Sequence, residues 1–204
     1  MTRSPRSTGA TTPIARLKVV LDDVEPQVMR RLDVPLSIRL DRLHEVLQAA
    51  LGWSNSHLYE LVFKGVGFGL PDDGWGDGPM DARKARLIDI IEDTGTRSFK
   101  YLYDFGDGWE HSIKIEKIMP SIEGVSYPCL VEASGACPPE DSGGPWGFMD
   151  ARQALADPSH ERHQEVREWW GIETYDPTAV SILVIEASLE KLAKRWAPRR
   201  RAPK

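Results

Sequence analysis

The chain has 204 residues, of which 41% are hydrophobic and 28% are charged, and its formal net charge at pH 7 is −5. This length and composition predict one globular domain with a substantial core, and the presence of only two cysteines excludes a disulfide framework. No apolar run approaches the roughly 20 residues that span a bilayer, and the first residues lack the apolar segment of a signal peptide. We therefore expect a cytoplasmic protein with no membrane partner.

Basic residues gather at both ends of the chain. Residues 194–204 contain six basic groups and residues 1–13 contain two, with no acid in either segment. The acidic segment between them does not suit broad contact with phosphate backbones. We expect any DNA contact to come from a local patch or from the basic tail, through Arg199, Arg200 and Arg201. The alternative is that this tail is a solvated, disordered end.

The N-terminal part of the domain predicts a hairpin followed by a helix. Apolar residues alternate over residues 14–21 and again over residues 28–34, which is typical of two strands joined by a turn. Leucines recur at helical spacing over residues 39–51. Ser37 is the expected cap of this helix and Gly52 its stop.

A third strand is predicted over residues 58–64, and His57 falls on the same face as its apolar residues. The glycine-rich, acidic residues 65–78 predict a long loop, either a flexible insertion or a lid. The loop does not open a helix, as a phosphate cradle does, and it lacks the terminal Glu of a calcium loop. A short helix is expected over residues 82–92.

The clearest pattern lies between residues 99 and 118 and predicts a second hairpin. Residues with aromatic, imidazole or β-branched side chains alternate along both strands and form one apolar face; they are Phe99, Tyr101, Tyr103, Trp109, His111, Ile113 and Ile115. The tight turn between the strands contains Asp104 and Asp107. These aspartates are either turn formers or a carboxylate pair beside His111.

The remainder of the chain combines an irregular segment with helices. The Pro and Gly of residues 127–147 exclude a helix and a central strand, so we interpret this segment as an ordered, functional loop. Helices are predicted over residues 148–156 and 160–170, and a third from Asp176-Pro177 to about Trp196. The expected buried side of the third helix consists of Val180, Leu183, Val184, Ala187, Leu189, Leu192 and Ala193.

Three separated motifs carry a family resemblance. They are Leu43-His44 with Gly52-Trp53-Ser-Asn-Ser-His57-Leu58, then Tyr103-Asp-Phe-Gly-Asp-Gly-Trp-Glu-His111, then Cys137-Pro-Pro-Glu-Asp-Ser-Gly-Gly144 with Gly147-Phe148. The Asp157-Pro158 and Trp169-Trp170-Gly171 segments also fit. On these residues the chain resembles the plasmid pRiA4b ORF-3-like family over a domain of residues 14–196. A disordered tail is expected over residues 1–13 and a basic tail over residues 197–204.

The resemblance implies an α+β fold: a single domain with a mixed, mostly antiparallel sheet, one helix after the N-terminal hairpin and a helical C-terminal region. It implies no established activity, although members are often labelled transposon-resolvase-like and some are associated with mobile elements. A serine recombinase needs a serine nucleophile in an ordered catalytic domain and a DNA-reading helix pair. Ser4 and Ser7 lie in the expected disordered tail and no basic recognition helix is visible, so the sequence does not support that label.

Two hypotheses of function follow. The first is a non-catalytic binding or accessory protein associated with mobile DNA elements, supported by the family context, the basic tail and the lack of a complete catalytic motif. The second is a metal-dependent hydrolase, in which histidines near element ends meet acids and a thiol from loops. The candidate cluster is His44, His57, Asp104, Asp107, His111, Cys137, Glu140 and Asp141.

Within this cluster, His57, His111 and Cys137 are the candidate ligands of a divalent metal. No pair has the HExxH or CxxC spacing of a zinc site. The alternative is that each histidine lies at the edge of the core, bonded to a nearby Asp or carbonyl. Another hypothesis makes Cys137 a nucleophile and Cys129 its resolving thiol, against the alternative that a buried thiol packs as a small hydrophobe. A purely structural role for the Gly, Pro and Trp residues of these loops also stays open.

Overall fold

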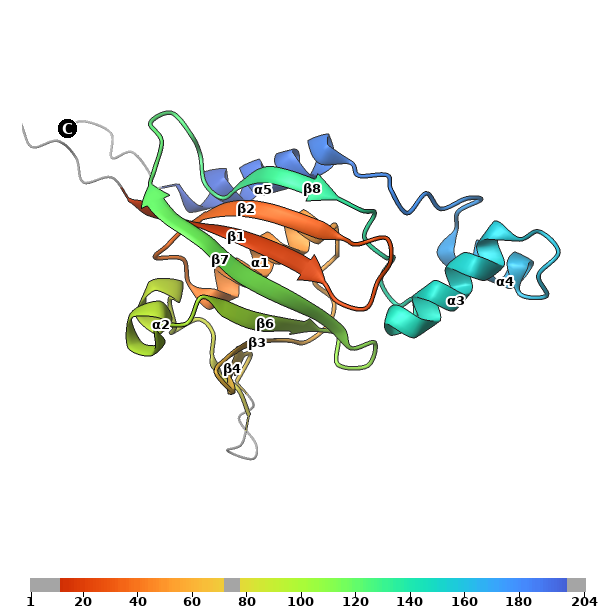
Figure 1. Cartoon of the computed structure of the whole chain (residues 1–204), viewed down its shortest axis with the longest axis horizontal. Helices are drawn as coiled ribbons and strands as arrows, with labels where there is room; N and C mark the ends of the chain where they lie inside the picture. The colour runs from red at the N-terminus through yellow and green to blue at the C-terminus, as the bar shows by residue number, and fades with distance from the viewer. Residues whose placement is uncertain (1–11, 72–77, 198–204) are drawn as a thin grey trace, which may run out of the picture.

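The computed structural model describes residues 12–71 and 78–197. Within them, eight strands form one sheet in the order β5-β4-β3-β6-β7-β1-β2-β8 (Figure 1). Neighbouring strands are antiparallel except β4 and β5, which are parallel. The strands are β1 (Pro13–Leu21), β2 (Met29–Pro35), β3 (Tyr59–Phe63), β4 (Val66–Gly69), β5 (Met80–Asp81), β6 (Ser98–Tyr103), β7 (Trp109–Pro120) and β8 (Cys129–Ser134). The helices are α1 (Leu40–Leu51), α2 (Leu87–Thr94), α3 (Gly144–Ala156), α4 (His163–Trp170) and α5 (Ile182–Trp196).

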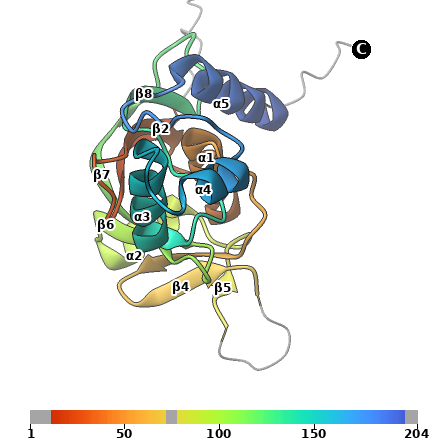
Figure 2. The ribbon, with the colours of Figure 1, turned by 90° about the vertical axis from the view of Figure 1, so that its right-hand side faces the viewer.

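This arrangement is the α+β fold with a mixed, mostly antiparallel sheet that the resemblance implies. Helices α1 and α5 lie on the same side of the sheet, behind the strands in Figure 1, and α5 contacts both α1 and β8. The leucine stripe of α1 is buried in the main core, as its spacing predicts. Helices α3 and α4 pack on each other at one end of the sheet (Figure 2). Among the described residues, no helix is both long and apolar enough to cross a bilayer.

The second hairpin forms as predicted, and its strands β6 and β7 lie in the middle of the sheet. Strands β6 and β7 pair with Tyr101 opposite His111 and Tyr103 opposite Trp109. All four of these side chains are buried, because they occupy the face that the alternation predicts. The turn closes through a hydrogen bond of 2.6 Å from the Gly108 amide to the Asp104 carbonyl.

The predicted cap of α1 is wrong. The helix begins at Leu40 with Arg39 at the N-cap position and has no side-chain cap. Instead, the Leu40 amide donates to the carbonyl of Ala85, over 3.0 Å. A segment distant in sequence therefore provides the acceptor for a helix amide that has no partner within the helix, which explains why Ser37 is not needed as a cap. The same pairing makes α2 start at Leu87 rather than at residue 82.

Two segments predicted as loops contain strands. Part of the 65–78 segment forms β4, which pairs with β3, and part of the 127–147 segment forms β8, which pairs with β2. Strand β8 is at the edge of the sheet, so the exclusion of a central strand holds. The exclusion of a helix is wrong for residues 144–147, because α3 begins at Gly144 and its proline lies in the first turn, where proline is tolerated. Backbone hydrogen bonds to a neighbouring strand stabilise these two strand segments, and the local amino-acid composition does not indicate that pairing. The acidic residues 72–77, expected to form a flexible insertion or a lid, lie outside the described residues.

The C-terminal helices differ from prediction in their starts and in one buried face. Helices α3 and α4 begin at Gly144 and His163, and α5 begins at Ile182, several residues after Pro177. Leu183, Val184 and Ala187, expected on the buried side, are exposed, the first two by 81% and 63%. The true buried side is Ile185, Leu189, Leu192 and Ala193. The apolar residues of the first turn of α5 therefore lie on its exposed side.

Candidate functional site

Three separated segments meet beside the β6–β7 turn: the loop after α1, the turn itself, and residues 137–144. The Trp53 indole N–H donates to the carbonyl of Pro138 over 2.9 Å. The Gly143 amide donates to Asp107 Oδ2 over 3.1 Å. At Gly144, where φ is +68°, an added Cβ would lie 2.1 Å from the Asp107 carbonyl oxygen. Only glycine permits this approach, so the Gly-Gly pair docks the third segment onto the turn.

Glu140 fastens this junction. Its carboxylate accepts hydrogen bonds from the Ser54 amide and hydroxyl, from the Ser56 hydroxyl and, over 2.6 Å, from the Tyr103 hydroxyl. Burial acts to raise the pKa of Glu140, but the hydrogen bonds from Ser54 and Tyr103 outweigh it and lower the pKa. Glu140 is therefore an ionised clamp whose oxygens are already engaged.

His57, Asp104 and Asp141 form a second group on the outer side of the junction. His57 Nδ1 lies 3.6 Å from Asp104 Oδ2, and His57 Nε2 lies 3.1 Å from Asp141 Oδ1 without the alignment of a hydrogen bond. The His57 side chain is 28% exposed, and that of Asp141 is 71% exposed. One potential metal-ligand atom from each residue lies within 4.8 Å of the other two. In the described part of the chain, this is the only such group of three or more His, Cys, Asp or Glu residues.

The backbone around this group is unusual. Asp104 and Asp141 both have φ of +55°, and Asn55 in the adjoining loop has φ of +61°. Left-handed conformations are uncommon outside glycine, although Asp and Asn tolerate them better than other residues. The role of Asp104 in the turn partly explains its left-handed conformation, because its Oδ1 accepts hydrogen bonds from the amides of Gly106 and Asp107. Among the described residues, Asp141 accepts no such hydrogen bond, and its carboxylate lies against His57.

His44 belongs to the core beneath the junction. The Tyr101 hydroxyl, which accepts from Gln48 Nε2 over 2.9 Å, donates to His44 Nδ1 over 2.8 Å. His44 Nε2 then donates to Asn55 Oδ1, and the ring stacks on Tyr59 at 3.5 Å. Burial lowers the pKa of His44 to about 4. His44 is thus a neutral core ring with both nitrogens engaged, although its partners are Tyr101 and Asn55 rather than the Asp or carbonyl that the core-edge alternative expects.

His111 is also a core residue and does not lie beside the carboxylates of the turn. Its Nδ1 donates to the Tyr101 carbonyl over 3.2 Å, and its ring meets Trp53 edge-on at 5.4 Å. Burial lowers the pKa of His111 to about 4. Its Nε2 has no hydrogen-bond partner, but the side chain is wholly enclosed. The structure therefore gives the position beside Asp104 to His57 rather than to His111.

Both cysteines are free thiols, as expected. Burial raises the pKa of Cys137 to about 12 and that of Cys129 to about 11. Thiols with such values stay protonated at neutral pH, which argues against the nucleophile hypothesis and favours the packing alternative. Cys137 is also absent from the His57 group. The predicted basic contacts Arg199, Arg200 and Arg201 lie outside the described residues.

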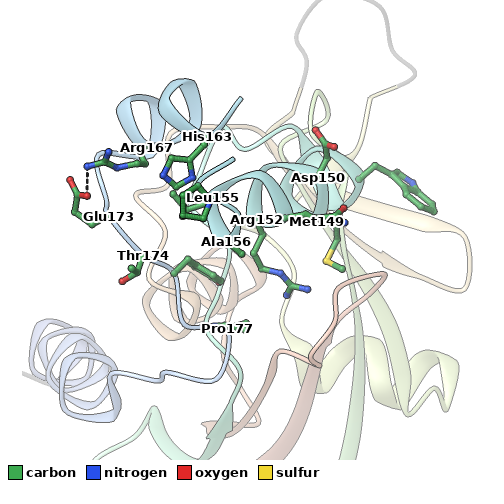
Figure 3. Close-up of a pocket in the computed structure, with 14 residues that line it drawn as sticks. Met149, Asp150, Arg152, Leu155, Ala156, His163, Arg167, Glu173, Thr174 and Pro177 are labelled. Atoms are coloured by element: carbon green, nitrogen blue, oxygen red, sulfur yellow. Dashed lines mark hydrogen bonds and ion pairs between the residues drawn. The ribbon is translucent and has the colours of Figure 1, made fainter. Parts of the chain in front are cut away.

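A large cavity lies elsewhere, between α3, α4 and the segment that follows α4 (Figure 3). Its volume is about 950 Å3, and none of the eight predicted cluster residues lines it. Two of the polar groups in it are engaged with the protein: Arg167 pairs with Glu173, and His163 Nδ1 contacts the Ala154 carbonyl at 3.1 Å. We therefore place the candidate site at the junction and not in this cavity.

Sequence reasoning missed Ser54, Asn55, Ser56 and Tyr103 as site residues. Their signal was present, because all four belong to motifs that carry the resemblance. What the sequence lacked was the partner, since Glu140 is 84 and 86 residues from Ser56 and Ser54.

The fold and the junction define a class: an α+β protein whose three family motifs meet at one end of a mixed sheet. The family model for plasmid pRiA4b ORF-3-like protein matches residues 13–183, and the chain belongs to this family. It is 59% identical over 188 residues to the uncharacterized protein y4hQ of Sinorhizobium fredii, covering 92% of this chain and 96% of that protein. The crystal structure of MM3350 from Methanosarcina mazei Go1, a protein of unknown function, is 32% identical. It superimposes with a TM-score of 0.74 and covers 84% of this chain and 96% of its own.

Proposed function

We propose that this protein binds a divalent metal ion through His57, Asp104 and Asp141 and uses the ion to activate water for hydrolysis. The observation that carries the proposal is the approach of an imidazole nitrogen and two carboxylate oxygens to within 4.8 Å of one another. Imidazole suits transition metals such as Zn2+, and carboxylates suit these ions and harder ones such as Mn2+. The left-handed aspartates support the same reading, because strained backbone gathers where side chains are aimed for function.

The distances fit an ion once one of the three side chains turns toward it. Around an ion with ligands at about 2.1 Å, neighbouring ligand atoms lie about 3.0–3.5 Å apart. The contacts of 3.6 Å to Asp104 and 3.1 Å to Asp141 are close to this spacing, but they involve different ring nitrogens of His57. Binding by all three residues requires one side chain to turn toward the shared ion. Asp141 has that freedom, because its side chain is 71% exposed.

The arrangement is suited to activating water. Three protein ligands leave coordination positions open, as in catalytic rather than structural metal sites. A bound ion lowers the pKa of its water and makes hydroxide available near neutral pH. The exposed side of the group gives a substrate access, while the Glu140 clamp holds the two loops that carry His57 and Asp141.

The test is metal binding by protein purified without an affinity tag or chelator. We expect elemental analysis and calorimetric titration with Zn2+ and Mn2+ to find one ion per chain. His57→Ala and Asp104→Asn should each weaken binding by about 100-fold or more, since even outer-sphere partners of a metal site contribute 10- to 100-fold. Asp107→Asn is the matched control, because it neutralises the other aspartate of the same turn and keeps a side-chain oxygen that can accept the hydrogen bond from the Gly143 amide. Unchanged affinity in His57→Ala would contradict the proposal.

Hydrolysis needs its own measurement. We expect metal-dependent turnover in a screen of phosphoester, carboxylic ester and peptide substrates, absent in His57→Ala and retained in Asp107→Asn. If the protein binds one metal ion per chain but hydrolyses none of these bonds, the hydrolase proposal is contradicted and only metal binding stands.

A second candidate function, non-catalytic binding, is favoured by one observation: a groove lined by arginines at the other end of α1. The association with mobile DNA elements, and DNA contact through Arg199, Arg200 and Arg201, stay predictions.

A further inference from the structure

A groove of about 520 Å3 lies where α1 and α2 begin and α5 ends. Arg39, Arg42 and Arg86 line it, together with residues that include Ser37, Ser126 and Trp196. It is at the opposite end of α1 from the His57 group, so the 12 residues of the helix separate the two sites by roughly 18 Å. The groove is therefore independent of the proposed metal site.

The positive charge in this groove is only partly neutralised. Arg39 forms two hydrogen bonds with Asp41, of 2.9 and 2.6 Å. The next acid along α1, Glu45, is paired with Arg195 at 2.9 Å. Among the described residues, neither Arg42 nor Arg86 has an ion pair or a side-chain hydrogen bond; Arg42 lies over the Trp196 ring at 5.1 Å. The groove thus presents two guanidinium groups without a counter-charge.

The backbone brings two of these arginines together at a cost. Arg39 and Arg86 oppose each other in an isolated antiparallel bridge, flanked by backbone hydrogen bonds that join the starts of α1 and α2. Directly opposed residues of an antiparallel pair project to the same side, and like charges there are destabilising. Asp41 relieves this repulsion for Arg39 alone. An anion in the groove would relieve it for Arg86 and Arg42.

We propose that this groove binds the phosphate group of a nucleotide. Guanidinium groups recognise phosphate oxygens through paired, charge-assisted hydrogen bonds, and the two serine hydroxyls add further donors. A volume of about 520 Å3 is larger than one phosphate needs and falls in the range of small-molecule pockets. The nucleotide is either free or part of a strand. A strand fits the sequence that follows, because Arg199, Arg200 and Arg201 come directly after the groove residue Ala197 and Pro198.

The test measures binding in EDTA, so that no metal at the His57 group bridges to a phosphate. Adenosine 5′-monophosphate is titrated by calorimetry, and a fluorescein-labelled 12-nucleotide single-stranded DNA by anisotropy, at 50 and 200 mM salt. The variants are Arg86→Gln, the double variant Arg42→Gln/Arg86→Gln, and Arg97→Gln as a control for the loss of an exposed arginine elsewhere. Circular dichroism and thermal melting establish whether each variant is folded. If the double variant does not fold, binding by Arg86→Gln alone is the test.

We expect the double variant to bind at least about tenfold more weakly, and Arg97→Gln to bind as the parent does. For the strand, losing two phosphate contacts should reduce the slope of log affinity against log salt by roughly 1.4. Binding of both probes makes the groove a nucleotide site, and binding of the strand alone makes it a strand-phosphate site. The proposal is overturned if folded protein binds neither probe at 50 mM salt. It is also overturned if Arg97→Gln weakens binding as much as Arg86→Gln, or if deleting residues 198–204 abolishes binding that the double variant retains.

Discussion

Two regions beside the Tyr101 and Tyr103 rings use histidine in opposite ways. Beneath the rings, His44 and His111 are buried and neutral, with pKa values lowered to about 4 because burial disfavours the charged ring. Above them, His57 is partly exposed and lies between two carboxylates. The three residues look alike in sequence, since each falls on an apolar face near an element end. Burial and the loop packed outside decide which of them can meet a ligand.

The largest expected effect is the acid sensitivity of the buried pair. In the folded protein both rings stay neutral down to about pH 4, whereas in the unfolded chain they take up protons near their ordinary value of 6.5. The unfolded state therefore binds more protons in this window, and the free energy of unfolding should be constant above pH 6.5 and fall as the pH drops toward 4. The loss is up to about 3 kcal/mol for each histidine. Urea denaturation at a series of pH values measures it.

This comparison is sharpened by His111→Gln, which removes one of the two titrating rings. The pH dependence between 6.5 and 4 should shrink by about half. If the slope is unchanged, acid sensitivity has another source and the contrast between buried and partly exposed histidines loses its basis.

The next effect is a split between stability and binding. His111→Ala removes a fully buried ring and should lower the free energy of unfolding by about 2–4 kcal/mol, while folded protein keeps its metal affinity. His57→Ala should do the reverse and change stability by less than about 1 kcal/mol. Denaturation curves and metal titrations on both variants check this. Loss of metal binding in folded His111→Ala would break the division between core and site.

The smallest effect on stability is expected at Asp141. Asp141→Gly provides the residue that suits φ of +55° and removes a largely exposed carboxylate, so stability should stay within about 1 kcal/mol of the parent. Metal affinity should nevertheless fall by about 100-fold or more.

Asp23→Gly is the matched control, because Asp23 has φ of +59° and is absent from the metal-ligand group. It should keep both stability and metal affinity. Equal metal affinity in Asp141→Gly and Asp23→Gly would remove Asp141 from the proposed ligands.

The alternation of apolar residues and the glycine that ends a helix determined much of the fold. The aromatic alternation from Phe99 to Ile115 predicted the central hairpin with its buried face, because a strand repeats every two residues regardless of its neighbours. The leucine spacing before Gly52 predicted α1 and its end for the same local reason, and the φ of +87° at Gly52 is the left-handed stop that glycine supplies. The family motifs contain the three segments that meet at the junction.

Only the tertiary structure decided what those loops and the helix starts do. The start of α1 is satisfied by a carbonyl 45 residues away, that of Ala85, and this pairing also creates the arginine groove. His57 rather than His111 lies beside Asp104, because the docking of Gly144 on the turn brings Asp141 to the outer side of the junction. These contacts join residues far apart in the chain, and hydrogen bonding and burial act on distance in space. The spacing of residues along the sequence shows neither which distant residues are hydrogen-bonded nor which side chains are buried.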